Sequence, residues 1–147
     1  MVKLSQRDPR WGNYRMIPSI YTIAKIGCTT TCISMLSDWY GHFRTPNIMA
    51  SMHIPYTKDG LIIWGGMKLQ GFNFQKRLRT TDHKAIQESL KGKDTSVILE
   101  VDGCHWVVAL SRVPFTNTYR IADPWDGKVK LSTAYKKVTG SAHFIRS

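Results

Sequence analysis

The spacing of apolar residues along the chain predicts helices in the first 90 residues. From Cys28 to Tyr40, small or apolar residues recur every three or four positions, which is typical of a helix with one buried face. Gly41 is placed to end this helix. Thr45-Pro46 matches an N-cap followed by proline at the first helical position, so a short helix is expected to run to about His53.

The segment from Asp59 to Gly71 is interrupted by glycines, and its pattern is ambiguous. The apolar positions within it favour one short helix around Leu61 to Leu69. A clearer signal follows at Asp82, which is expected to cap a helix from His83 to Leu90 that ends at Gly92.

Beyond residue 95 the pattern changes to that of strands. Five short segments are rich in β-branched, aromatic and aliphatic residues: Ser96 to Val101, His105 to Ser111, Tyr119 to Ala122, Val129 to Leu131, and Ala142 to Ile145. Helices followed by consecutive strands indicate an α+β fold, in which N-terminal helices pack on a C-terminal antiparallel sheet.

Composition and charge narrow the class of protein. The 147 residues suit one domain, residues 1–147, and 42% hydrophobic with 21% charged residues is ordinary for a folded chain. The formal net charge of +11 predicts attraction to polyanions such as nucleic acid, an anionic membrane or an anionic cell wall. The basic residues are dispersed, which favours a generally basic surface over a dedicated binding arm.

The N-terminal residues contain no apolar stretch of the kind found in signal peptides, and no run approaches the length of a transmembrane helix. We therefore expect a cytoplasmic location in the producing cell, with release by lysis or carriage in a phage particle. Three cysteines at irregular spacing argue against a disulfide framework, so at least one thiol should be free.

Cys28 has the features of a nucleophilic thiol. It follows Gly27 at the predicted start of a helix, and a helix N-terminus lowers the pKa of a thiol. Cys32 lies one turn further along the same face and is interpreted as a small buried hydrophobe.

His105 is the best candidate for the base that activates this thiol. It begins the most apolar predicted strand. If residues from Pro114 to Asn117 turn a roughly symmetric hairpin, Asp123 returns beside His105 and can orient its imidazole, as in a Cys–His–acid site. Asp126 is the reserve candidate for the acid. The sequence offers no comparable thiol and acid partners for the other four histidines, which are His42, His53, His83 and His143.

A site that transfers an acyl group also needs donors for the oxyanion. The backbone amide of Cys28 can serve as one donor, and the side-chain amide of Gln6, near the N-terminus, can serve as the second.

With these residues in place, the chain resembles the C39-like cysteine peptidases, papain-like domains related to the peptidases that process bacteriocin leaders. The resemblance rests on four segments in the family's order: Ser5-Gln6-Arg7-Asp8-Pro9-Arg10-Trp11, Ile26-Gly27-Cys28-Thr29-Thr30-Thr31, His105-Trp106-Val107-Val108 and Asp123-Pro124-Trp125-Asp126-Gly127.

The resemblance implies a papain-like α+β fold, with Cys28 as nucleophile, His105 as general base, Asp123 as the acid that orients it, and Gln6 in the oxyanion hole. Two positions depart from the family. Cys32 stands where a serine or another small residue is common, and Cys104 precedes the histidine. If His105 points toward the site, strand alternation predicts that Cys104 points away.

The function expected from these features is hydrolysis of a peptide or isopeptide bond through a thioester on Cys28. The substrate class we favour is the peptide of bacterial cell walls, cut by an enzyme of the phage lysin or virion type, since a basic protein is drawn to an anionic wall. A plain intracellular or toxin-associated protease is the alternative within the enzyme class.

Two other classes of function stay open at this level. One is a non-catalytic basic module that binds nucleic acid or wall polymer on the same scaffold. The other is a zinc site built from Cys28, Cys32, Cys104 and His105, although neighbouring strand residues point to opposite faces. No cofactor or metal is expected for the peptidase.

Overall fold

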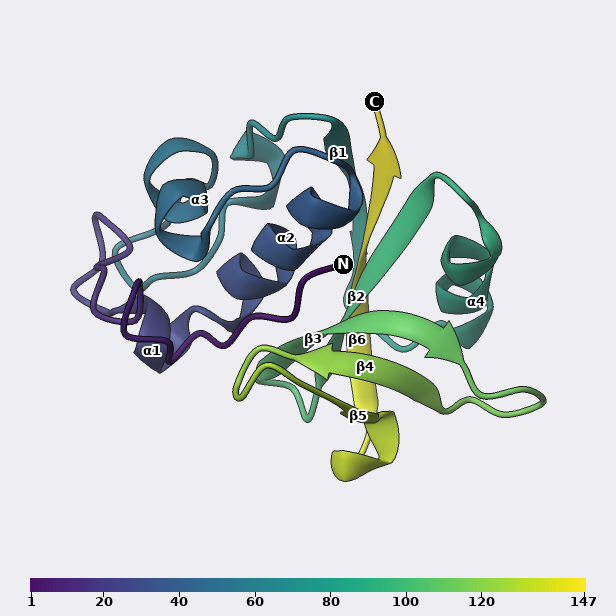
Figure 1. Cartoon of the computed structure of the whole chain (residues 1–147). Coiled ribbons are helices and arrows are strands. Elements are labelled where there is room, and N and C mark those ends of the chain that lie inside the picture. Colours follow the sequence, from purple (N-terminus) through teal and green to yellow (C-terminus); the bar gives the residue numbers. More distant parts are fainter.

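A computed structural model describes all residues, 1–147. The elements in chain order are α1 (Ile23–Ile26), α2 (Cys28–Trp39), α3 (Pro46–Met52), the 3-10 turn η1 (Trp64–Gly66), β1 (Phe72–Leu78), α4 (His83–Lys91), β2 (Thr95–Val101), β3 (His105–Arg112), β4 (Tyr119–Asp123), β5 (Lys128–Leu131), the 3-10 turn η2 (Ser132–Ala134) and β6 (Val138–Arg146). The α+β class is therefore confirmed (Figure 1).

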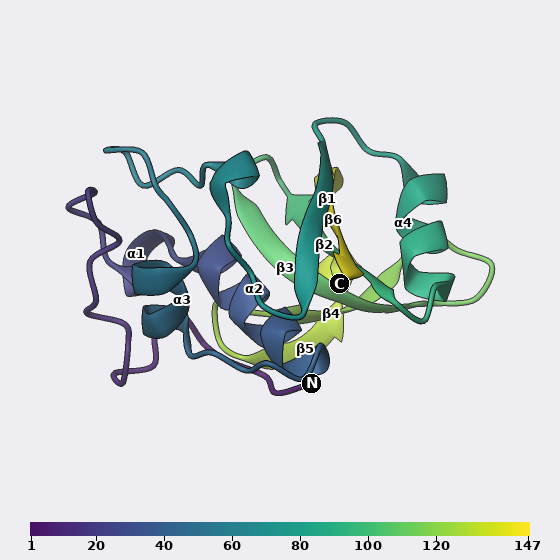
Figure 2. The same ribbon diagram turned by 90° about the horizontal axis from the view of Figure 1, so that it is seen from above.

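All six strands form one antiparallel sheet in the order β1-β6-β2-β3-β4-β5. Helices α1 to α3 lie on one side of the sheet and α4 lies on the other (Figure 2). Helix α2 packs across β3, whereas α4 packs against β2, β3 and β6. None of the helices has the length and apolar character that a membrane span requires.

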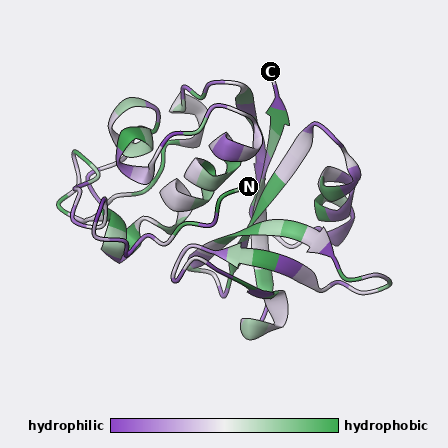
Figure 3. Cartoon of the chain, in the orientation of Figure 1, coloured by the Kyte–Doolittle hydropathy of each residue, from purple (hydrophilic) through white to green (hydrophobic).

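The two faces of the sheet bury two separate hydrophobic cores. Apolar residues concentrate along β2 and β3 (Figure 3), and they alternate between the cores because successive side chains on a strand point to opposite faces. On β3, Trp106 and Val108 join the larger core under α2, while Val107 and Ala109 join the smaller core under α4. Strand β3 is thus fixed from both sides, and His105 begins it.

The helix signals in the sequence are largely confirmed. Gly41 follows α2 with a φ of +83°, a conformation that favours glycine. Asp82 caps α4 by accepting a hydrogen bond from the Ala85 amide, 3.0 Å long. Thr45 is the N-cap residue of α3 as expected, but its hydroxyl donates to Asn47 and makes no capping bond.

Three expectations about the fold are wrong. The segment from Leu61 to Leu69 forms only the turn η1, since two successive glycines at its centre, Gly65 and Gly66, disfavour a helix. Strand β1 was not expected, and it precedes α4, so the helices do not all come before the sheet. Strand β6 also begins four residues earlier than the pattern indicated, at Val138.

The hairpin between β3 and β4 forms as predicted. The Val113 amide donates to the carbonyl of Thr118 across the turn, and Val108 pairs with Ala122. The register shifts between Ala109 and Ser111, where the ladder has a bulge. This hairpin carries Asp123 back along β3 toward its beginning.

His143 is a buried histidine that predicts a pH-dependent stability. Its ring lies between Ser89 and Ser141, with 2.7 Å from Nδ1 to Ser89 Oγ and 2.8 Å from Nε2 to Ser141 Oγ. Burial, followed by the charge of Lys76, lowers its pKa from 6.5 to about 4. The unfolded chain therefore binds more protons than the folded chain between these two values, and stability should fall as the pH falls through this window.

We expect His143 to account for about 3 kcal/mol of lost unfolding free energy between pH 6.5 and pH 4. Urea denaturation across this range measures the loss, and His143→Gln is the matched variant, because an amide can also bond both serines without titrating. The variant should show a flatter pH dependence than the wild type. Identical curves would contradict the assignment.

Candidate active site

Cys28 is placed at the start of α2 by a tight junction between two helices. A Cβ atom on Gly27 would lie 2.6 Å from the Ile23 carbonyl oxygen and 2.7 Å from the Ile23 Cα, so only glycine fits between α1 and α2. Gly27 has no side chain to cap α2, and the Cys28 amide donates to no other backbone group. This amide is therefore available to an external acceptor.

Cys28 is 8% exposed, and its thiol lies beside His105. Burial raises its pKa, but the hydrogen bond and the charge of His105 act in the opposite direction, helped by the Trp106 backbone and the Thr29 hydroxyl. The net effect lowers the pKa of Cys28 below 9.0. The surroundings therefore favour a thiolate.

His105 is held on its other side by Asp123. The distance from His105 Nε2 to Asp123 Oδ1 is 2.8 Å, and Asp123 is fully buried. Burial alone would lower the pKa of His105, but hydrogen bonds to Asp123 and Cys28 and the charges of both raise it to about 9. The surroundings of His105 therefore favour the protonated imidazole beside the Cys28 thiol.

Asp123 receives three further donors, which fix the carboxylate in place. The Trp125 amide donates to Oδ1 at 3.0 Å, Lys130 Nζ lies 3.0 Å from Oδ2, and the Tyr135 hydroxyl donates to the same oxygen. Burial raises the pKa of Asp123, but the bonds from His105, Tyr135, Trp125 and Lys130 bring it well below its usual range. The acid thus stays ionised.

Lys130 and Tyr135 were not identified from the sequence. Lys130 lies two residues beyond Lys128, the partner of Asp123 across β4 and β5, so strand alternation was the available signal. Tyr135 follows the turn η2, and no local pattern connects it with Asp123.

Asp126, the reserve candidate for the acid, does not contact His105. Its Oδ1 accepts the Lys128 amide at 3.1 Å and its Oδ2 lies 2.9 Å from Lys130 Nζ. It therefore helps to hold Lys130 between two carboxylates. The structure brings Asp123 to the imidazole, as the hairpin argument predicted.

Gln6 lies beside α1, the short helix that precedes α2. It is 2% exposed, its backbone amide donates to Pro124, and its Nε2 donates to the Ala24 carbonyl at 3.1 Å. Ala24 lies four residues before Cys28, so this bond uses the acceptor that a continuous helix would offer to the Cys28 amide. One N–H of the Gln6 side chain stays available, and its Oε1 is buried without a partner.

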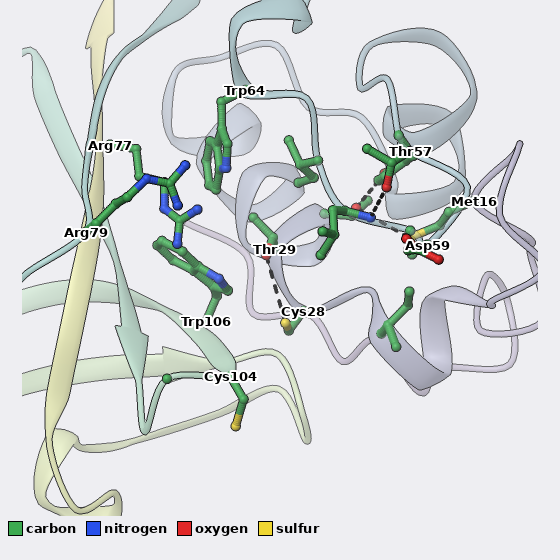
Figure 4. Close-up of a pocket in the computed structure, with 17 residues that line it drawn as sticks. Met16, Cys28, Thr29, Thr57, Asp59, Trp64, Arg77, Arg79, Cys104 and Trp106 are labelled. Atoms are coloured by element: carbon green, nitrogen blue, oxygen red, sulfur yellow. Dashed lines mark hydrogen bonds between the residues drawn. The ribbon is translucent and has the colours of Figure 1, made fainter.

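The other two cysteines lie in different surroundings. Cys32 is fully buried and its thiol donates to the Trp106 carbonyl at 3.4 Å. Burial, with the charges of Cys28 and Asp123, raises the pKa of Cys32 well above 9.0, in agreement with a structural role. Cys104 is exposed and belongs to the turn before β3. It borders the same cavity as Cys28, and its thiol points away from the Cys28 thiol (Figure 4).

A metal site at these residues is not supported. Cys28, Cys32, Cys104 and His105 do not form a ligand group, nor does any other set of three or more cysteine, histidine or acidic residues. The remaining histidines make contacts of a structural kind, such as His53 Nδ1 with the Lys68 carbonyl and His83 Nδ1 with the Tyr119 hydroxyl.

A cavity of about 500 Å³ opens beside Cys28 (Figure 4). Met16, Thr57 and Asp59 lie at one end, and Trp64, Trp106 and two arginines lie at the other (Figure 4). The Tyr56 hydroxyl and the Thr30 hydroxyl bond to each other and hold the loop after α3 against α2. The thiol therefore faces a cleft with walls from both halves of the chain.

Two comparisons with known proteins yield no relative. A scan against protein-family models gives no match, and a search of curated proteins finds no similar sequence.

The interaction between Cys28 and His105 predicts how the alkylation rate of the thiol depends on pH. In the wild type, we expect iodoacetamide to alkylate Cys28 at half its maximal rate below pH 9, since the imidazolium stabilises the thiolate. In His105→Ala the burial that raises the pKa of Cys28 is opposed only by the Trp106 backbone and the Thr29 hydroxyl, so the midpoint should move to higher pH. Mass spectrometry of digests, taken over a pH series, gives the rate at Cys28 alone.

His42→Ala is the matched control, because His42 is exposed and follows the opposite end of α2. Its midpoint should equal that of the wild type. An unchanged midpoint in His105→Ala would mean that the imidazole does not act on the thiol.

Proposed function

We propose that the chain is a cysteine peptidase that hydrolyses a peptide or isopeptide bond through a thioester on Cys28. The observation that carries this proposal is the series of contacts from the Cys28 thiol through His105 to the buried Asp123 carboxylate. This order of thiol, imidazole and acid is what nucleophilic acyl transfer requires. A non-catalytic module has no need of it.

The first half of the reaction forms the acyl-enzyme. The Cys28 thiolate attacks the scissile carbonyl carbon, and the carbonyl π electrons move to its oxygen. The Cys28 amide at the start of α2 is one donor to this oxyanion, and the second donor is the N–H of the Gln6 side chain that is not bonded to Ala24. When the tetrahedral intermediate collapses, the C–N bond breaks and the His105 imidazolium gives its proton to the leaving amine.

The second half releases the acid. The now neutral His105 takes a proton from water, whose oxygen attacks the thioester carbonyl, and the C–S bond breaks to restore the thiolate. Asp123 keeps the imidazole oriented throughout and stabilises its protonated form.

The proposal includes a papain-like fold of the C39-like type. The support is the helix α2 that carries the thiol and packs on an antiparallel sheet, whose strands β3 and β4 supply the base and the acid. The four sequence segments that resemble the family contribute the nucleophile, the base, the acid and the amide of this arrangement.

For the substrate, we favour the peptide of bacterial cell walls, cut by an enzyme of the phage lysin type. The support is the net charge of +11, which attracts the protein to an anionic polymer. The volume of the cleft beside Cys28, about 500 Å³, is in the range of ligand-binding pockets.

The test is incubation of the protein with purified peptidoglycan and with a peptide library, followed by mass spectrometry of the products. Wild-type protein should release new amino termini in at least one substrate, and protein alkylated at Cys28 should release none. A covalent acyl adduct at Cys28, trapped at low pH, would identify the thioester. Equal product yields from wild-type and alkylated protein would reject the proposal.

A further inference from the structure

Two arginines project into the cleft that contains Cys28, and the mechanism above does not use them. Arg77 lies near the end of β1, and Arg79 follows directly after this strand. Positions two apart on an extended chain share a face, and both side chains line the cavity (Figure 4). Strand β1 is an edge strand of the sheet, with β6 as its one neighbour.

Arg77 is held in the wall of the cleft, and its charge is paired with an acidic residue. Its guanidinium pairs with Glu100 at 3.1 Å, and both side chains are largely buried. It also lies over the rings of Trp64 and Trp106, at 5.5 Å and 5.2 Å from their centroids. Its Nε is buried and has no hydrogen-bond partner. Arg77 is therefore held in place with a donor still unpaired.

Arg79 carries the charge that nothing in the fold neutralises. It is exposed, it makes no ion pair within 4.0 Å, and it forms no hydrogen bond through its side chain. Its charge reaches Arg77, because the pKa of Arg77 is lowered first by burial and then by Arg79, against the opposing effect of Glu100. Asp59 is the one acidic residue that lines the cavity, and it pairs with neither arginine.

We propose that Arg79, supported by Arg77, binds a carboxylate of the substrate, so that the cleft selects acidic peptide segments over neutral ones. A guanidinium matches a carboxylate through two parallel hydrogen bonds. The rings of Trp64 and Trp106 hold the neighbouring Arg77 guanidinium in place beside this position. The term substrate rests on the proposed function. The anion site itself rests only on the cavity and its charges.

Two alkylating reagents test the anion site without a peptide. Iodoacetate carries a carboxylate and iodoacetamide is neutral, and both react with the Cys28 thiolate inside the cleft. In Arg79→Ala we expect the ratio of the iodoacetate rate to the iodoacetamide rate at Cys28 to fall about two- to five-fold at low ionic strength, and less in high salt. The attraction of iodoacetate to His105 is common to both proteins and cancels in the comparison.

Arg120→Ala is the matched control, because it removes the same charge from an exposed position on β4 that does not line the cavity. Its ratio should equal that of the wild type. Equal ratios in wild type and Arg79→Ala, or the same fall in both variants, would overturn the anion site. Truncation of Arg79 should not affect folding, since the side chain is exposed and without partners.

A second measurement uses peptide pairs that differ only by glutamate and glutamine near the scissile bond. Wild type should cut the glutamate member with the higher kcat/KM, and Arg79→Ala should lose this preference while Arg120→Ala keeps it. Hydrolysis without a preference for the acidic member would overturn the selectivity. If Arg79→Ala lowers the ratio of the iodoacetate rate to the iodoacetamide rate as expected, but the wild type cuts no peptide, the proposed peptidase function is rejected and the anion site is retained.

Discussion

Replacing Cys28 by alanine should reduce turnover by at least about 10³-fold, because no other group in the cleft can form the thioester. Cys104 lines the same cavity, but its hydrogen-bonding contacts do not include an imidazole. The loss should appear in kcat, with substrate binding largely retained. Product formation from the peptide or peptidoglycan that wild type cuts, followed by mass spectrometry, gives the measurement.

Cys32→Ala is the control for this variant, since both thiols lie on α2 and only Cys28 contacts His105. Loss of the bond from Cys32 to the Trp106 carbonyl should lower stability by about 1 kcal/mol, and turnover should persist. If Cys28→Ala cleaves as well as wild type, the thioester mechanism is wrong. A basic binding module would then be the better interpretation, and steep salt dependence of polyanion binding would support it.

Cys28, His105 and Asp123 could be predicted because each lies at an element with a strong local signal, whereas Gln6 lies in the irregular segment before α1. Gly27 and the apolar spacing after it indicate the start of α2, and the turn from Pro114 to Asn117 determines which residues return beside His105. The bulge in this hairpin shifts the register by one residue, yet Asp123 still reaches the imidazole.

What the sequence did not reveal depends on contacts between distant segments. Strand β1 is an edge strand in which Phe72 is the one residue that is fully buried, so its pattern lacks the regular alternation of a half-buried strand. Its pairing with β6 is formed by residues about seventy positions away. For the same reason the positions of Arg77 and Arg79 on the wall of the cleft could not be anticipated.

The side chains that hold the Asp123 carboxylate could likewise not be predicted from local sequence patterns. Tyr135 reaches the carboxylate only because β5 folds back alongside β4 and the turn η2 follows it. Lys130 is shared between Asp123 and Asp126, which keeps one cation beside two acids and leaves Asp123 free to pair with His105. These contacts make Asp123 the best-held residue of the candidate site.

Replacing Asp123 by alanine should therefore impair both folding and chemistry. The carboxylate is fully buried and accepts from four groups, so its removal leaves buried donors without an acceptor. The loss of one member of such a buried network costs about 3–5 kcal/mol of unfolding free energy. The pKa of His105 should also fall from about 9, because burial opposes its charged form and the acid no longer compensates.

Asp123→Asn separates the two effects, since it keeps the shape of the side chain and removes its charge. We expect this variant to fold and to lose about 10²-fold or more in kcat, with the alkaline limb of the pH–rate profile moved to lower pH. Asp126→Ala is the matched control: its carboxylate is partly exposed and does not contact His105, so stability should change by less than about 1 kcal/mol and the alkaline limb should stay in place. An alkaline limb that does not move in Asp123→Asn would show that the acid holds the fold and not the protonation state of the imidazole.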